Sequence, residues 1–149
     1  MRMVFEQPLY LRLAWGELDV TEVDGLGDNP RIVDYHATTH GGASPDAVSW
    51  CSSFVNWCVT RAGLVGAISK AARSWLDWGE ACEPQYGCIC VLWRGAPSGW
   101  QGHVGILVGE DHSNVYLLGG NQSNRVRVSR YPKSQVLGYR RSSAAAEVA

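Results

Sequence analysis

The stretch SWCSSFVNWCVTRAG, residues 49–63, predicts a helix with a cysteine in its first turn. From Cys51 onward, apolar residues recur at three- and four-residue steps, the spacing that brings side chains to one face of an α-helix. Ser49 is a candidate N-cap, and Gly63 supplies the left-handed residue that ends many helices. The positive end of the helix dipole favours a thiolate at Cys51, whereas Cys58 lies two turns deeper. We therefore expect Cys51 to be the reactive thiol.

The composition of the whole chain limits the number of domains and the classes of function to which this thiol can belong. The chain has 149 residues, a formal net charge of -1 and a pI near 6.4. These values favour one domain and argue against nucleic-acid binding, which needs a basic surface. We expect a monomer with a single domain over residues 1–141 and a disordered tail over 142–149. No apolar run approaches the roughly 20 residues that span a bilayer, and the first fifteen residues are too polar for a signal peptide.

The order of the predicted elements is helices first and strands afterwards. Helices are expected at residues 8–18, at 28–36 with Asn29 as cap and Pro30 as first helical residue, and at 69–79. Short β-branched or alternating runs follow, separated by Gly, Pro, Asn and Ser; they are CICVLW (88–93), HVGILVG (103–109), NVYLLGG (114–120), VRVSRY (126–131) and VLGYRR (136–141). This order predicts an α+β fold with N-terminal helices packed on a small antiparallel sheet.

A nucleophilic cysteine needs a base, and His103 is the best candidate among the four histidines. It opens an apolar strand directly after a loop rich in glycine, where a base can stand at the rim of a cleft. A first-turn cysteine with such a histidine is the pair in which imidazole takes the thiol proton and later protonates the leaving amine. Asn121, which ends the next strand, is a candidate to hold the imidazole, although Gly-Gly-Asn is also common turn chemistry.

The spacing of the cysteines, histidines and acidic residues favours neither a metal site nor a disulfide. The five cysteines include no C-x-x-C pair, and a disulfide from Cys82 to Cys88 or Cys90 stays open. His36 and His40 have a chelating spacing, but the Thr- and Gly-rich sequence around His40 disfavours a helix. An acidic loop with Asp24 and Asp28 is a weak calcium candidate. We expect no metal and no cofactor.

Taken together, the motifs resemble the NlpC/P60 and CHAP superfamily of papain-like cysteine peptidases and amidases. The resemblance rests on WCSSFVNWCVTRAG, AARSWLDWG, CICVLWRGAPSGWQGHVGILVGE, VYLLGGNQSN and YPKSQVLGYRR, which occur in this order between residues 8 and 141. Within the superfamily, the chain is most similar to a compact group of bacterial and phage peptidoglycan hydrolases. The resemblance implies a papain-like fold and hydrolysis of peptidoglycan amide bonds, either within the stem peptide or between muramic acid and L-alanine.

By the same resemblance, Cys51 matches the nucleophile, His103 the base and Asn121 the polar residue after the following strand. Two positions depart from the family pattern. Many CHAP proteins have a glutamate two positions before the asparagine, where this chain has Gly119. Their Pro-Gly-Asp-Ile turn corresponds to YGCICV, with Cys88 in place of the acid. The papain-type oxyanion glutamine has no counterpart before Cys51, whose own backbone N–H is then the first candidate for that task.

Substrate contacts are expected near the nucleophile and from the loop before the base. The expected residues are Ser49, Trp50, Trp93, Trp100 and Gln122. Two other functions remain open: a catalytically silent module that binds the cell wall, and a Cys–His acyltransferase that passes the acyl group to an amine. The expected place of action is the cell wall, in the periplasm or outside the cell. Delivery would be by a phage holin, as for an endolysin, or by a secretion system, as for an effector with an immunity protein as partner.

Overall fold

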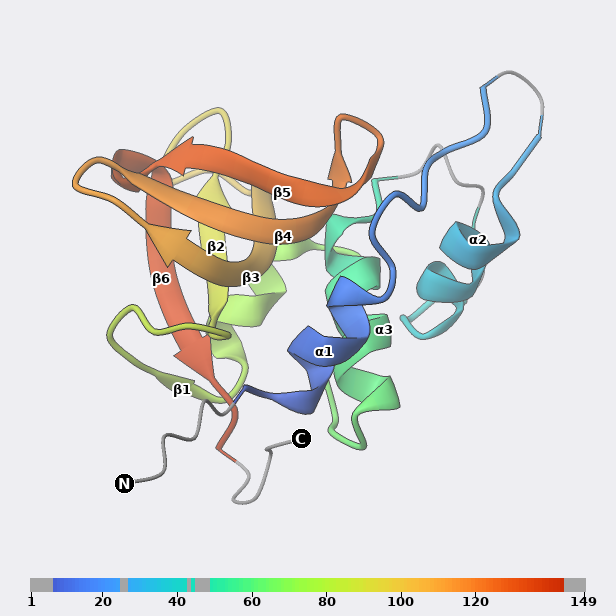
Figure 1. Ribbon diagram of the computed structural model, residues 1–149, viewed down its shortest axis with the longest axis horizontal. Coiled ribbons are helices and arrows are strands. Elements are labelled where there is room, and N and C mark those ends of the chain that lie inside the picture. Colours follow the sequence, from blue (N-terminus) through green and yellow to red (C-terminus); the bar gives the residue numbers. More distant parts are fainter. Residues whose placement is uncertain (1–6, 25–26, 43, 45–48, 144–149) are drawn as a thin grey trace, which may run out of the picture.

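Helices precede strands in the computed structural model of the protein, as the sequence predicts (Figure 1). The structure describes residues 7–24, 27–42, 44 and 49–143, so most of the predicted tail lies outside the described residues. The elements are α1 (Leu9–Trp15), α2 (Pro30–Ala37), α3 (Cys51–Arg61), the 3₁₀ helix η1 (Ala72–Asp77), β1 (Glu80–Ala81), β2 (Ile89–Trp93), β3 (Gly102–Glu110), β4 (Asn114–Gln122), β5 (Arg125–Pro132), η2 (Lys133–Gln135) and β6 (Val136–Arg141). No helix in the described part of the chain is long and apolar enough to cross a membrane.

The strands form one sheet of six in the order β1-β6-β2-β3-β4-β5, and every pair of neighbours is antiparallel. Strands β3, β4 and β5 are long and curl over the shorter β2 and β6 (Figure 1). The register shifts once within β4, between Gly119 and Gln122, where it pairs with β5. This shift lies at the end of β4 that faces α3, and it decides which side chains reach the site.

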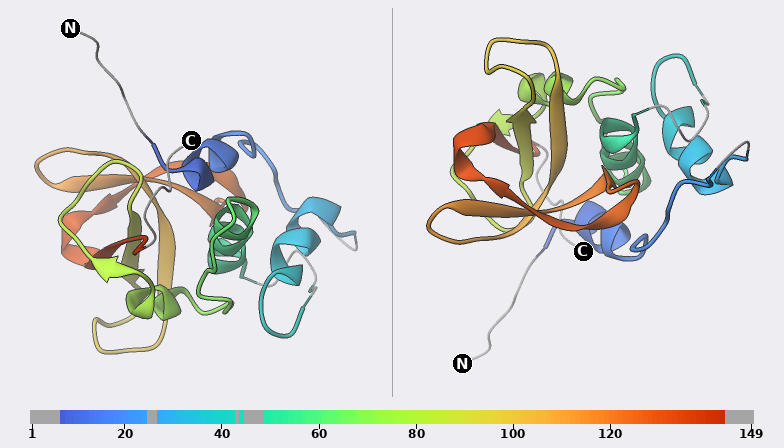
Figure 2. Two further views of the ribbon diagram at one scale, coloured as in Figure 1. Left: turned by 90° about the horizontal axis from the view of Figure 1, so that it is seen from below. Right: turned by 90° about the horizontal axis from the view of Figure 1, so that it is seen from above.

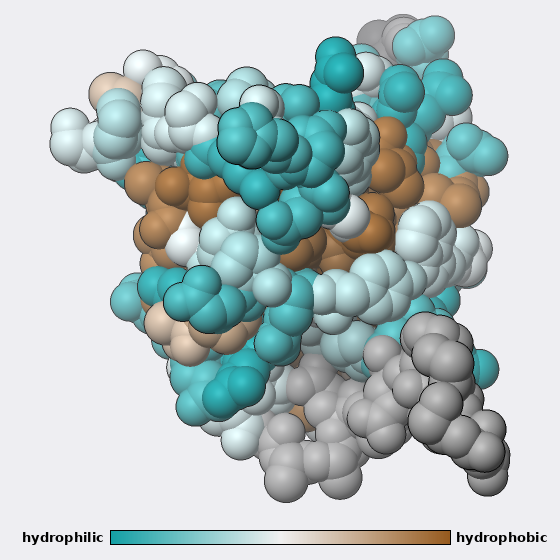
Figure 3. All heavy atoms as spheres, turned by 60° about the vertical axis from the view of Figure 1, so that its left-hand side comes forward, coloured by the Kyte–Doolittle hydropathy of each residue, from teal (hydrophilic) through white to brown (hydrophobic). Residues whose placement is uncertain are grey.

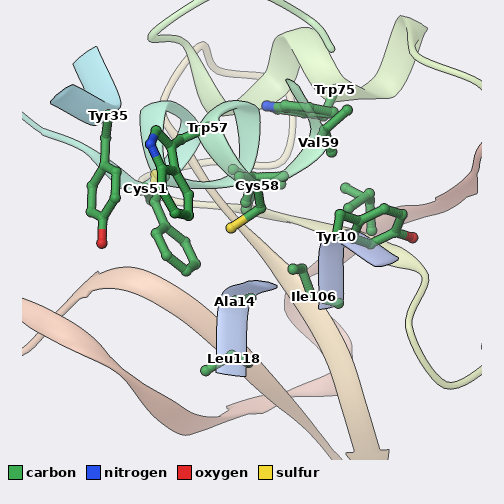
Figure 4. Close-up of a cluster of buried hydrophobic side chains, with 14 of the residues drawn as sticks. Tyr10, Ala14, Tyr35, Cys51, Trp57, Cys58, Val59, Trp75, Ile106 and Leu118 are labelled. Carbon is green, nitrogen blue, oxygen red and sulfur yellow. The ribbon is translucent and has the colours of Figure 1, made fainter. Parts of the chain in front are cut away.

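Helix α3 is the central helix of the fold. It contacts α1, α2, β3 and β4, and Figure 2 shows it between the sheet and α2. Every residue from Cys51 to Val59 is buried, which explains why its sequence is apolar or small on nearly every side. The larger core cluster joins α3 to the inner face of the sheet through side chains such as Tyr10, Ile106 and Leu118 (Figure 4).

A second, smaller core lies on the other face of the curled sheet. Its buried members are Cys88, Cys90, Leu92, Leu107, Val115 and Leu117. Seen from the left-hand side of Figure 1, the molecule shows apolar atoms in recesses between polar side chains (Figure 3). The prediction that Cys88 and Cys90 are small core residues on one face is confirmed, with Cys90 in β2 and Cys88 just before its start.

The predicted helix boundaries are confirmed in part. Asn29 caps α2, accepting a hydrogen bond from the Arg31 N–H, and Pro30 is the first helical residue. The helix expected at residues 69–79 is instead the six-residue 3₁₀ helix η1. Trp75, in η1, and Trp78, which follows the end of η1, pack edge to face with ring centroids 5.3 Å apart. The N-cap of α3 is Trp50 rather than Ser49, and Trp50 makes no side-chain capping bond.

The end of β4 lies directly against the first turn of α3. A Cβ atom at Gly120 would come within 2.7 Å of the Trp50 ring and of the Phe54 side chain. A glycine is therefore required at this position, because any side chain would push the strand away from the helix. This close approach holds the residues that follow Gly120 next to Cys51.

Candidate active site

Cys51 is the first residue of α3 and is almost completely buried, with 3% of its surface exposed. Burial alone would raise the pKa of its thiol. The charge of His103 and its hydrogen bond to the sulfur, the Val104 N–H and the charge of Arg94 together outweigh burial, so the pKa is lowered. The position at the helix N-terminus acts in the same direction. Cys51 is therefore a thiol prepared to lose its proton.

Cys58 has the opposite environment. It is completely buried in the core cluster, where Figure 4 shows its sulfur among apolar side chains. Burial, reinforced by the negative charge of Glu17, raises the pKa of this thiol well above its ordinary value. Cys58 therefore stays a neutral packing residue.

His103 lies in β3 beside Cys51 and is 1% exposed. Its Nε2 atom is 2.9 Å from Gln122 Oε1 and 3.2 Å from the Tyr131 hydroxyl. The Tyr131 ring packs against the imidazole with centroids 5.2 Å apart. Since Nε2 is occupied by these two groups, Nδ1 is the nitrogen left for the Cys51 thiol.

The amide of Gln122 determines which ring nitrogen carries the proton. Its Nε2 group donates to the backbone carbonyls of Leu117 (3.1 Å) and Arg127 (2.6 Å), which uses both amide hydrogens. The remaining atom, Oε1, only accepts, so His103 Nε2 must donate to it. Neutral His103 then has a free lone pair on Nδ1, which is the tautomer that can take the thiol proton.

Asn121 does not make the contact that the sequence suggested. Its backbone has a φ of +57°, and its half-buried side chain donates to Ser49 Oγ at 3.4 Å. The register shift after Gly119 turns Asn121 outward and Gln122 inward. A Cβ atom at residue 119 would lie 2.6 Å from Gln122 Oε1, so Gly119 makes room for this amide. Gln122 is thus the imidazole partner, not a substrate contact, and it is 3% exposed.

A cavity of about 400 Å³ opens at Cys51. Its lining residues are Ser49, Cys51, Lys70, Ala71, Ala72, Arg94, Trp100, Gln101 and Gly102. Trp100 is 81% exposed at its edge, as expected of an indole available to a ligand. The structure therefore brings Ser49 and Trp100, two of the expected substrate residues, to the cleft that contains the reactive thiol.

The cleft wall that carries Trp100 is anchored by Arg73 of η1. Its guanidinium donates to the carbonyls of Ala96 (2.7 Å), Pro97 (2.8 Å) and Gln101 (2.8 Å). Three charge-assisted bonds hold the loop between β2 and β3 in one conformation. Nothing in the sequence pattern distinguished Arg73 from other surface arginines, because its partners are backbone atoms more than twenty residues away.

The other two predicted substrate residues do not reach the cleft. Trp50 is completely buried, packs on Tyr35 with ring centroids 5.9 Å apart, and donates from Nε1 to Glu22 at 3.0 Å. The structure thus places the Trp50 indole in the core and not at the cleft, where it was expected. Trp93 is partly buried, donates to the Ser134 carbonyl and does not line the cleft.

The alternative metal and disulfide sites gain no support. All five cysteines are free thiols. His36 is buried, with Nδ1 2.7 Å from Ser53 Oγ, and His40 is exposed. Among the residues that the structure describes, no group of three or more His, Cys, Asp or Glu could hold a metal ion. Part of the loop between Asp24 and Asp28 lies outside the described residues.

Comparison with known proteins identifies the fold. No protein-family model matches the sequence, and no curated protein matches the chain. An NlpC/P60 family protein from Bacillus cereus ATCC 10987 is similar with a TM-score of 0.57 and 15% identity, over 91% of this chain and 40% of that one. NlpC1 from Trichomonas vaginalis is similar with a TM-score of 0.52 and 16% identity, over 89% and 42%. The chain thus spans about two fifths of the length of each structure.

Proposed function

From the NlpC/P60 fold that this chain shares with both solved structures, we propose that it is a cysteine hydrolase of amide bonds in bacterial peptidoglycan. The observation that carries the proposal is the hydrogen-bonded series of Cys51, His103 and Gln122, whose cysteine lines an open cleft. A silent wall-binding module would need the cleft but not a thiol with a lowered pKa. The substrate class comes from the resemblance of the motifs to peptidoglycan hydrolases.

In the proposed mechanism, His103 Nδ1 takes the proton of Cys51, and the thiolate attacks the carbonyl carbon of the amide bond. The imidazolium then protonates the leaving nitrogen, the C–N bond breaks, and a thioester remains on Cys51. Water attacks the thioester after giving a proton to Nδ1. The C–S bond breaks, the proton returns to the sulfur, and a carboxylic acid is released.

Gln122 and Tyr131 would act through the imidazole rather than on the substrate. When Nδ1 is protonated, the positive charge spreads over the ring, and the bond from Nε2–H to Gln122 becomes stronger. The Tyr131 oxygen accepts from the same N–H, and its ring fixes the plane of the imidazole. The backbone N–H of Cys51, at the uncapped end of α3, is the candidate donor to the oxyanion.

Product analysis on purified sacculi tests the proposal. Hydrolysis adds one water to each cleaved bond, and the masses of the soluble fragments identify whether the bond lies in the stem peptide or next to muramic acid. An acyltransferase would instead add the mass of an amine acceptor, and a binding module would release nothing. Iodoacetamide should stop the release of fragments, whereas EDTA should leave it unchanged. Release that resists alkylation and needs a metal would refute the cysteine mechanism.

The biological setting that fits this proposal is lysis or remodelling of the cell wall. A phage endolysin released by a holin and an injected effector are both consistent with the same chemistry. The effector setting would require an immunity protein that blocks the cleft. Co-purification from the native host, with or without an inhibitory partner, separates the two.

Trp100→Ala should lower activity on sacculi several-fold with almost no change in melting temperature. The indole is 81% exposed, so truncating it removes little packing, and exposed substitutions change the free energy of unfolding by only about 0.5 kcal/mol. Its apolar faces can instead cover a sugar or peptide in the cleft. A lysis assay beside a thermal melt measures both effects. Trp93→Ala, outside the cleft, is the control and should not reproduce the loss of activity.

A further inference from the structure

The charged residues that line the cleft are all cationic. Among the described residues, Lys70 and Arg94 contribute the charged side chains of the cavity wall, and no Asp or Glu lines it. The chain as a whole has a net charge of -1, so this local excess of positive charge is not a general property of the surface. Such a cleft attracts anionic groups and repels cations.

The two cations are held differently. Lys70 is partly buried, and its Nζ donates to the carbonyls of His40 and Gly42, both at 2.9 Å. Arg94 is exposed, and its backbone N–H donates to the Gln101 carbonyl at 3.1 Å, which fixes the start of the loop. Its guanidinium makes no hydrogen bond or ion pair with any residue that the structure describes. The donors of Arg94 are therefore available to a ligand.

Arg94 is close enough to the catalytic groups to act on them electrostatically. Its positive charge contributes to the lowered pKa of Cys51. Burial raises the pKa of Tyr131 to about 12, and the charge of Arg94 opposes this rise. Arg94 and Cys51 also line the same cleft, so a ligand bound there can contact both side chains. A group bound to it would be part of the substrate close to the scissile bond.

We propose that Arg94 binds a carboxylate that the substrate carries next to the scissile amide, with Lys70 adding positive charge to the same subsite. A guanidinium pairs with a carboxylate through two parallel hydrogen bonds, which gives geometric selection as well as attraction. The preferred substrate is therefore an acidic peptide segment, and the same segment with its carboxylate converted to a carboxamide is a poor substrate. This inference rests on the proposed hydrolase function and specifies its substrate.

The test compares two synthetic stem peptides that differ only in carboxylate or carboxamide next to the cleaved bond. The parent protein should show a kcat/KM about 10- to 100-fold higher for the carboxylate peptide, the range expected for a charge-assisted pair. Arg94→Gln should bring this ratio close to 1. Arg94→Lys, which keeps the charge and loses the bidentate geometry, should give an intermediate ratio.

The ratio of kcat/KM for the two peptides also separates carboxylate binding by Arg94 from any change in the reactivity of Cys51. Loss of the Arg94 charge makes the Cys51 thiolate less favourable, but this slows both peptides equally and is measured by the rate of alkylation. Arg130→Gln, an exposed arginine of β5 outside the cleft, is the matched control and should keep the parental ratio. Equal kcat/KM for both peptides in the parent would overturn the carboxylate subsite and leave the hydrolase function standing. Cleavage of neither peptide, nor of sacculi, would overturn both.

Discussion

Cys51→Ala is expected to reduce hydrolysis of peptidoglycan to background, a loss of at least about 10⁴-fold, in a protein that stays folded. Cys51 is the only one of the five cysteines whose thiol combines a lowered pKa with a place on the cleft. No other residue can form the thioester, so the whole mechanism depends on its sulfur. Release of soluble fragments from sacculi and a thermal melt measure activity and folding together.

Cys58→Ala is the matched control, because it removes the same atom from the same helix. This thiol is buried in the core and its pKa is raised, so the variant should keep its activity. It should lose about 1 kcal/mol of unfolding free energy from the small void that is left. The assignment of the nucleophile is wrong if Cys58→Ala is inactive while folded, or if Cys51→Ala lyses walls at the parental rate.

Alkylation gives an independent measurement of the same assignment. Iodoacetamide reacts with the thiolate, so the thiol with the lowered pKa should be labelled first near neutral pH. Burial raises the pKa of Cys88 to about 12 and also raises that of Cys90, so neither should compete. Peptide mapping by mass spectrometry after brief labelling should find the modification on Cys51.

The parts of the fold that the sequence predicted correctly are those set by local signals. The cap formed by Asn29 and Pro30 involves residues adjacent in the chain, and α2 begins there as expected. The helix from Cys51 follows from its apolar spacing, and Gly63, with a φ of +86°, follows its end. Runs of alternating residues also predicted the five longer strands, because alternation needs only the chain itself.

The side chains of the site were harder to predict because their partners are far apart in the sequence. Trp50 precedes a reactive cysteine and could equally line a cleft or fill a core, and only the packing of Tyr35 against it decides for the core. Arg94 gave no local signal, since its role depends on the position of Cys51 some forty residues earlier. The motifs predicted that Cys51 and His103 pair, and the structure brings the two together, whereas the groups around them required the three-dimensional structure.

Gln122 is the site residue whose role depends most clearly on the pairing of strands. The register that pairs Ile106 with Leu118 would, if continued regularly, bring residue 121 opposite His103. The sequence analysis chose Asn121 because it ends the strand after His103, and the Gly-Gly-Asn-Gln sequence gives no sign of the register shift after Gly119. The shift moves the imidazole partner by one residue, since consecutive side chains of a strand point to opposite faces. Register shifts of this kind depend on pairing with a neighbouring strand. The alternation of apolar and polar residues along one strand does not predict them.

Substitutions at the neighbouring residues Gln122 and Asn121 should therefore differ strongly in their effect on catalysis. Gln122→Leu should lower kcat by about 100-fold, because His103 loses the acceptor that fixes its tautomer and orients its ring. Asn121→Gly should stay within a few-fold of the parent, because glycine adopts the φ of +57° and the substitution removes a 3.4 Å hydrogen bond to Ser49. Steady-state kinetics on one peptide substrate compares the two variants directly.

A structural role alone would not produce the full pattern expected of Gln122→Leu. The substitution leaves the carbonyls of Leu117 and Arg127 without their donor, which costs about 1–3 kcal/mol of stability, so folding must be verified by a thermal melt. In the folded variant, a less well positioned imidazole stabilises the thiolate less, and the pKa of Cys51 should rise from its lowered value. The pH dependence of iodoacetamide labelling should then shift to higher pH, while KM changes little because Gln122 does not line the cleft. An unshifted labelling profile together with parental kcat would show that Gln122 only supports the sheet, and a large loss in Asn121→Gly would restore the asparagine as the third catalytic group.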